Sequence, residues 1–200
     1  MKIKLTILFS FFYSLAFTQE TFESALIPSK NGAVITYTSD EHAFTVTLNS
    51  NSIEPSDQPN FLTIDGWILQ SFILGYDNPK AKDMSVEENA KRALSQYVMY
   101  ELDYFKEQLK LEIEPKLEWG HMKGLYFYFW YFDTPPELET LQGQLFLTTM
   151  CFNQFLNLNI PLEKGKSFEE AKAYLMNIGK SITLHDHPID FESLYTELNK

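Results

Sequence analysis

The chain of 200 residues carries 27 aspartates and glutamates against 16 lysines and arginines, which gives a formal net charge of −11. This acidic balance opposes non-specific binding to nucleic acid and to anionic lipid, because both are bound through lysine and arginine side chains that neutralise phosphates, and we expect no nucleic-acid partner. Cys151 is the only cysteine, so no disulfide can form within the chain. Aromatic residues make up 16% of the sequence, and their large rings must supply the core.

The first eighteen residues have the pattern of an export signal. Two lysines precede an apolar run over 5–12, and small or polar residues follow it. An apolar segment of about ten residues is long enough to engage a secretion channel but too short to span a bilayer. We expect cleavage after Thr18 or Ala16, so that the mature chain begins near Gln19 and reaches a periplasm or the exterior. Residues 19–200 then form a single domain without a membrane span.

Paired strands are expected in the first half of the mature chain. Apolar and polar residues alternate over 33–38 and 43–48 with a short polar turn between them, which predicts a hairpin. A second hairpin is predicted over 61–64 and 67–76, because these segments flank Asp65-Gly66. That dipeptide tolerates the positive φ angles of a tight hairpin turn.

A long helix followed by two strands is expected in the middle of the chain. Ser85 and Glu88 have the spacing of a capping box, in which each side chain satisfies a free backbone amide at a helix start. Apolar residues then recur at three- and four-residue steps as far as Leu109, which predicts one buried helix face. Strands are predicted over 111–119 and 125–132, joined by a glycine-containing turn.

A strand pair and a second helix close the predicted domain. Residues 144–151 and 155–160 are apolar segments separated by a short turn near an asparagine. Ser167 and Glu170 repeat the capping-box spacing, and the apolar face that follows ends near Gly179. A brief return to the sheet over 182–184 and one weak helical turn near the C-terminus are also expected. Strands this close in sequence pair antiparallel.

The expected class is therefore α+β, with an antiparallel sheet of about six to seven strands and two helices packed on one face. The order of elements, and above all its ending from Gln144 to Ile182, resembles the PsbP-like α+β family. That family includes an extrinsic subunit of photosystem II and a Ran-binding nuclear transport factor. The resemblance rests on the strand pair GQLFLTTMCFNQFLNLNIP and the capped helix SFEEAKAYLMNIGKSI. It implies a non-enzymatic accessory or partner-binding role and assigns no functional residue.

Two histidines near the C-terminus are the candidates for metal binding. His185 and His187 are separated by one residue, so in an extended segment both rings would point to the same side. A stable zinc site needs a third or fourth ligand, which His42, His121 or Asp190 would supply only if the fold brings it near. The alternative, which we favour, is two solvated histidines.

Other reactive side chains lack a catalytic context. Cys151 lies in an apolar strand without a neighbouring base, which favours a buried, inert thiol over a nucleophile. The chain contains no G-x-S-x-G motif. Glu112, Glu114 and Glu118 lie on one side of a predicted strand. Paired carboxylates can hydrolyse glycosides, but a solvated sheet face also explains them.

Seven consecutive aromatic residues over 126–132 form the strongest candidate for a binding surface. Alternation along a strand sends their rings to two opposite faces. If one face stays open, it would form an apolar platform, joined by Trp119 and Trp67, for a protein or a sugar. The residues predicted to bind are Tyr126, Tyr128 and Trp130. The alternative is a central strand buried on both sides.

These features predict a secreted or periplasmic protein that binds a protein or glycan of the cell envelope without catalysis. No cofactor is implied, because the sequence has no glycine-rich phosphate loop, paired cysteine motif or helix with two metal-binding histidines. The alternative is a secreted hydrolase of a glycan or peptide that uses carboxylates or the terminal histidines. Metal carriage by the two terminal histidines is a third possibility.

Overall fold

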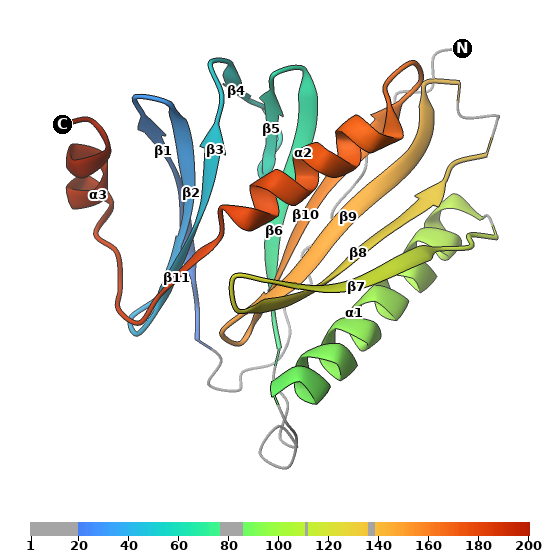
Figure 1. Ribbon diagram of the computed structural model, residues 1–200, viewed down its shortest axis with the longest axis horizontal. Helices are drawn as coiled ribbons and strands as arrows, with labels where there is room; N and C mark the ends of the chain where they lie inside the picture. Colours follow the sequence, from blue (N-terminus) through green and yellow to red (C-terminus); the bar gives the residue numbers. More distant parts are fainter. Residues whose placement is uncertain (1–19, 77–85, 111, 136–138) are drawn as a thin grey trace.

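The computed structural model describes residues 20–76, 86–110, 112–135 and 139–200, and these residues form two antiparallel sheets and three helices (Figure 1). The larger sheet has the strand order β4-β5-β6-β10-β9-β8-β7. Its strands are β4 (Ile53–Pro55), β5 (Phe61–Ile64), β6 (Trp67–Gly75), β7 (Lys116–Met122), β8 (Leu125–Asp133), β9 (Leu141–Cys151) and β10 (Gln154–Glu163). The predicted class, α+β with antiparallel pairing, is confirmed.

A second sheet of four strands has the order β1-β2-β3-β11. Its strands are β1 (Glu23–Ser29), β2 (Gly32–Thr38), β3 (Ala43–Asn49) and β11 (Thr183–His185). The helices are α1 (Val86–Leu109), α2 (Phe168–Lys180) and α3 (Phe191–Leu198). None of the helices in the described part of the chain combines the length and hydrophobicity that crossing a bilayer requires.

Both predicted hairpins form with the expected turn chemistry. β2 pairs with β3 in register from Gly32↔Asn49 to Thr38↔Ala43. β5 pairs with β6 around Asp65 and Gly66, whose φ angles are 50° and 80°. Two successive positive φ angles are the signature of a type I′ turn, whose twist matches that of the flanking strands.

The sequence signals for the helices agree with their packing. α1 buries six residues of the predicted apolar stripe: Ala90, Ala93, Leu94, Tyr97, Val98 and Leu102. Ser85, predicted to begin this helix, lies outside the described residues. Ser167 caps α2 as predicted, because its hydroxyl accepts a hydrogen bond from the backbone N–H of Glu170 at 3.4 Å.

The positions of the helices differ from the expected arrangement, in which both lie on one face. α1 packs against one face of β8 and β9, while α2 packs against the opposite face of β9 and β10 (Figure 1). The central strands are apolar on both sides, so each face needs its own cover. The face of the larger sheet that α2 covers also packs against the four-stranded sheet. There the hydroxyl of Tyr37 in β2 lies 2.8 Å from the hydroxyl of Ser71 in β6.

Candidate recognition surface on the outer strands

The aromatic strand β8 is buried on both faces. Phe127 and Phe129 belong to the core beneath α2, whereas Tyr128 and Trp130 belong to the core beneath α1. Trp130 is 0% exposed and Tyr128 is 9% exposed. The open face required by the binding hypothesis is therefore closed at these two predicted residues, because α1 lies over them.

Trp130 is held as a structural residue. Its ring stacks on Phe146 with centroids 3.7 Å apart and planes 4° apart. Its indole Nε1 donates a hydrogen bond of 3.0 Å to the hydroxyl of Thr148. A ring with both its apolar surface and its polar atom satisfied inside the protein contributes to stability, and it has no free group for a partner.

Tyr126, the third predicted residue, lies beyond the cover of α1 and stays partly exposed. Trp119 and His121 on the neighbouring strand β7 surround it: Trp119 stacks on Tyr126 at 5.6 Å with planes 9° apart, and the His121 ring lies 4.6 Å away. Trp119 is also partly exposed, and His121 is exposed. We call these three side chains the outer aromatic corner.

The register of β7 explains why this corner forms. His121 lies directly opposite Tyr126, and Trp119 lies opposite Tyr128, so all four side chains share one face of the sheet. In the part of the chain that the structure describes, β7 is the last strand of the larger sheet and pairs with β8. Leu117, on the same face, is 45% exposed. Apolar side chains thus continue along the edge of the sheet.

Positive charge lies beside the outer aromatic corner. The ammonium group of Lys91, an exposed residue of α1, sits 5.8 Å from the centroid of the Trp119 ring. The hydroxyl of Ser95 meets that of Tyr128 at 3.1 Å and ties the same part of α1 to the sheet. Trp67, expected to join the platform, does not: it stacks on Tyr174 of α2 at 5.9 Å, on the opposite face.

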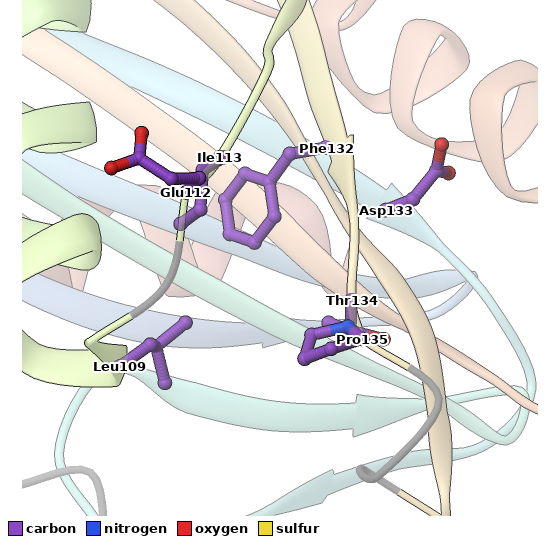
Figure 2. A pocket seen from close by; sticks show the side chains of 7 residues that line it. All are labelled: Leu109, Glu112, Ile113, Phe132, Asp133, Thr134 and Pro135. Atoms are coloured by element: carbon purple, nitrogen blue, oxygen red, sulfur yellow. The ribbon is translucent and has the colours of Figure 1, made fainter.

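Of the three predicted carboxylates, Glu112 lines a cavity with another acid, Asp133, and the two carboxylates do not face each other. A cavity of about 130 Å³ lies between the end of α1 and the end of β8, and Glu112 and Asp133 line it. Figure 2 shows their carboxylates pointing away from each other on opposite sides of Phe132. Asp133 instead pairs with Lys116 at 3.1 Å.

Glu118 and Glu114 have no part in that cavity. Glu118 pairs with Lys172 of α2 at 2.6 Å, which links the edge strand β7 to the helix. The lining of the cavity consists of Leu109, Glu112, Ile113, Phe132, Asp133, Thr134 and Pro135. Apart from its two diverging acids, this lining offers one hydroxyl and four apolar side chains.

The two terminal histidines lie at the edge of the smaller sheet. His185 ends β11, and its Nε2 lies 3.3 Å from the hydroxyl of Thr45, while the ring of His187 is 6.1 Å away. Partial burial lowers the pKa of His185, and the neighbouring His187 is a second, smaller cause of this shift. Within the described residues, none of the predicted further ligands His42, His121 and Asp190 joins them in a group of three metal-binding side chains.

Cys151 is fully buried at the end of β9. Burial raises the pKa of its thiol, so the side chain stays protonated near neutral pH. This environment agrees with the expected inert thiol.

A buried polar network, not predicted from the sequence, lies on the α1 side of the larger sheet. Gln144 donates to Asn159 at 2.8 Å, and Asn157 donates to the hydroxyl of Tyr97 at 2.9 Å. Asn159 joins these two pairs, because its amide donates to Gln70 at 3.0 Å and to Asn157 at 3.4 Å. The signal was present in the sequence as polar residues alternating with apolar ones in 154–160.

Comparisons with known proteins bear on the fold alone. No family model matches the chain, and no curated protein matches it. The structure is similar to the solution structure of cyanobacterial PsbP (CyanoP) from Synechocystis sp. PCC 6803, with a TM-score of 0.48 and 10% sequence identity. The match covers 76% of this chain and 92% of that one.

Proposed function

We propose that this protein is a non-catalytic accessory protein that works outside the cytoplasm and binds a protein or glycan of the cell envelope through the outer aromatic corner. The export pattern of the first eighteen residues supports the location. One observation carries the choice of surface: the exposed ring of His121 and the partly exposed rings of Trp119 and Tyr126 gather at the edge of the larger sheet, on β7 and β8.

The chemistry of the corner suits recognition. Trp and Tyr are enriched at interfaces because they bury much apolar area while keeping a polar atom for hydrogen bonding. The stacked pair of Trp119 and Tyr126 is already ordered, so binding would cost little side-chain entropy. Lys91 beside the pair adds a positive charge to an otherwise acidic protein, which favours a partner with an acidic or hydroxyl-rich surface.

The edge strand adds a second means of contact. Among the described strands, β7 has a partner only in β8, and an edge of this kind can accept an extended segment. The charged side chains of Lys116 and Glu118 on this strand oppose non-specific pairing with the edge strands of other molecules. A partner must therefore match both the rings and these charges.

Capture of envelope components with single-residue variants tests the proposal. The purified protein is immobilised, exposed to an envelope extract, and the bound proteins and glycans are identified. Trp119→Ala and Tyr126→Ala should each abolish retention of a component that the unaltered protein holds. Tyr195→Ala is the matched control, because Tyr195 is an exposed aromatic on α3. Equal retention by all four proteins would refute the surface.

The location is tested separately by cell fractionation and N-terminal sequencing. We expect a chain that begins near Gln19 in the periplasmic or external fraction. A cytosolic chain that still begins at Met1 would contradict the proposed location and leave the binding experiment unaffected.

A further inference from the structure

A histidine and two carboxylates from distant parts of the chain meet at the turn between β2 and β3. Donor atoms of Glu20, Glu41 and His42 all lie within 4.8 Å of one another. Nδ1 of His42 is 3.0 Å from Oε1 of Glu20. Glu41 and His42 are adjacent in the chain, whereas Glu20 lies 21 positions before Glu41, so the fold brings Glu20 to the other two.

We propose that Glu20, Glu41 and His42 bind a divalent transition-metal cation of the zinc class. Zinc is bound at about 2.0–2.2 Å by imidazole nitrogen and carboxylate oxygen, so two ligands of one ion lie roughly 3–3.5 Å apart. The Glu20 and His42 atoms already have that spacing. Glu41 is exposed, and rotation of its side chain can close the remaining distance.

The donor set defines the class of cation. One imidazole nitrogen with two carboxylates suits zinc or copper, whereas magnesium and calcium prefer sites made of oxygen alone. The cation would take the place of the hydrogen that His42 and Glu20 share, and Nδ1 must be deprotonated to bind it. Two carboxylates offset the charge of the ion, and water would complete its coordination.

Groups around the three ligands hold them in place. The hydroxyl of Ser39 hydrogen-bonds the Glu20 carboxylate and accepts the backbone N–H of His42 at 2.9 Å, which fixes the turn. The His42 ring stacks on Phe152 with centroids 4.2 Å apart. The side-chain amide of Gln154 donates to the Glu20 carbonyl at 3.3 Å. Partners of this kind orient metal ligands and raise affinity.

A bound ion would link Glu20 to the 39–42 turn, and the His42 ring of that turn stacks on Phe152. Glu20 precedes β1, the 39–42 turn joins β2 to β3, and Phe152 lies in the turn between β9 and β10. The first two belong to the smaller sheet and the third to the larger one. The ion would therefore strengthen the contact between the sheets, and folded protein would gain stability with cation concentration.

Zinc titration of the purified protein, free of any polyhistidine tag, tests the site by calorimetry at pH 7.5. We expect one ion per chain, a higher Tm with zinc, and no comparable heat with magnesium. His42→Gln and Glu41→Gln should each weaken binding at least tenfold. The matched control is the double change His185→Gln and His187→Gln, which should alter the affinity less than twofold.

Three outcomes would overturn the proposal. One is the absence of saturable zinc binding by the unaltered protein. Another is loss of binding in the control pair with retention in His42→Gln, which would place the ion at the C-terminal histidines. The third is equal binding by all variants. Circular dichroism of each variant confirms that the fold is intact.

Discussion

The hydroxyl of Tyr97 on α1 accepts a hydrogen bond of 2.9 Å from the amide of Asn157 in the middle of the larger sheet. Tyr97 in turn hydrogen-bonds the carboxylate of Glu101, one helical turn further on. Burial raises the pKa of Glu101 to about 7, although the bond from Tyr97 opposes this shift. The sheet side chains of this polar network are the neutral amides of Gln70, Gln144, Asn157 and Asn159. The carboxylate of Glu101 thus lies at the end of a chain of hydrogen bonds whose other named members are neutral side chains.

The first prediction concerns Glu101 and pH. Its folded-state pKa lies above its ordinary value of 4.5, so the folded protein holds the proton more tightly than the unfolded chain. The stability this provides is complete below about pH 4.5 and is lost as the pH rises through about 7. Glu101→Gln should therefore raise the free energy of unfolding at pH 8 by roughly 1–3 kcal/mol and change it little at pH 4.5.

Urea unfolding at several pH values between 4.5 and 8 measures this effect. Glu107→Gln is the matched control, because Glu107 is an exposed glutamate of the same helix. The control should follow the pH dependence of the unaltered protein. A constant difference between Glu101→Gln and the unaltered protein across the whole pH range would show that the carboxyl group does not titrate as described.

The second prediction separates structure from binding at Trp130. Trp130→Phe removes the stacked indole and the bond to Thr148, and should lower the free energy of unfolding by about 2–4 kcal/mol. Chemical denaturation measures the change, and Leu117→Ala, at an exposed position of β7, should cost less than about 1 kcal/mol. At temperatures where Trp130→Phe stays folded, its capture of envelope components should equal that of the unaltered protein. If folded Trp130→Phe failed to capture the components that the unaltered protein binds, Trp130 would instead be a residue that contacts the partner.

Local patterns in the sequence were sufficient for most of the fold. Alternation and Asp65-Gly66 predicted two hairpins, and helical spacing predicted α1 and α2. β1 was missed because Glu23–Ser29 contains Pro28 and lacks clear alternation. The strand predicted from residue 111 begins at Lys116, because Pro115 just before it has no N–H to give to a ladder.

The candidate site was harder to predict because burial depends on distant parts of the chain. The sequence showed that β8 has apolar residues on both faces. It did not show that α1 covers the face with Trp130 while α2 covers the other. It identified Tyr126 and Trp119 without showing that they stack. The meeting of Glu20 with His42 depends on how the start of β1 lies beside the 39–42 turn, which no local spacing encodes.

The third prediction concerns Gly120 in the edge strand. A Cβ atom at this position would lie 2.3 Å from Cζ of Phe127, the residue directly opposite in β8. Phe127 is packed in the core and cannot move away freely. Gly120→Ala should therefore cost about 1–3 kcal/mol of stability, measured by urea unfolding. The double change with Phe127→Leu should cost less than the sum of the single changes, and simple additivity would contradict the contact.

The fourth prediction concerns the thiol of Cys151. Full burial raises its pKa and blocks access, and only a thiolate reacts quickly with disulfide reagents. In the folded protein at pH 8, labelling by an aromatic disulfide reagent should be at least a hundredfold slower than in 6 M urea, where one thiol per chain should react. Addition of urea below the unfolding transition should leave the rate low, because exposure requires opening of the core around β9. Rapid labelling in native buffer would mean that β9 opens locally at its end, and Cys151 would then be available as a reactive group.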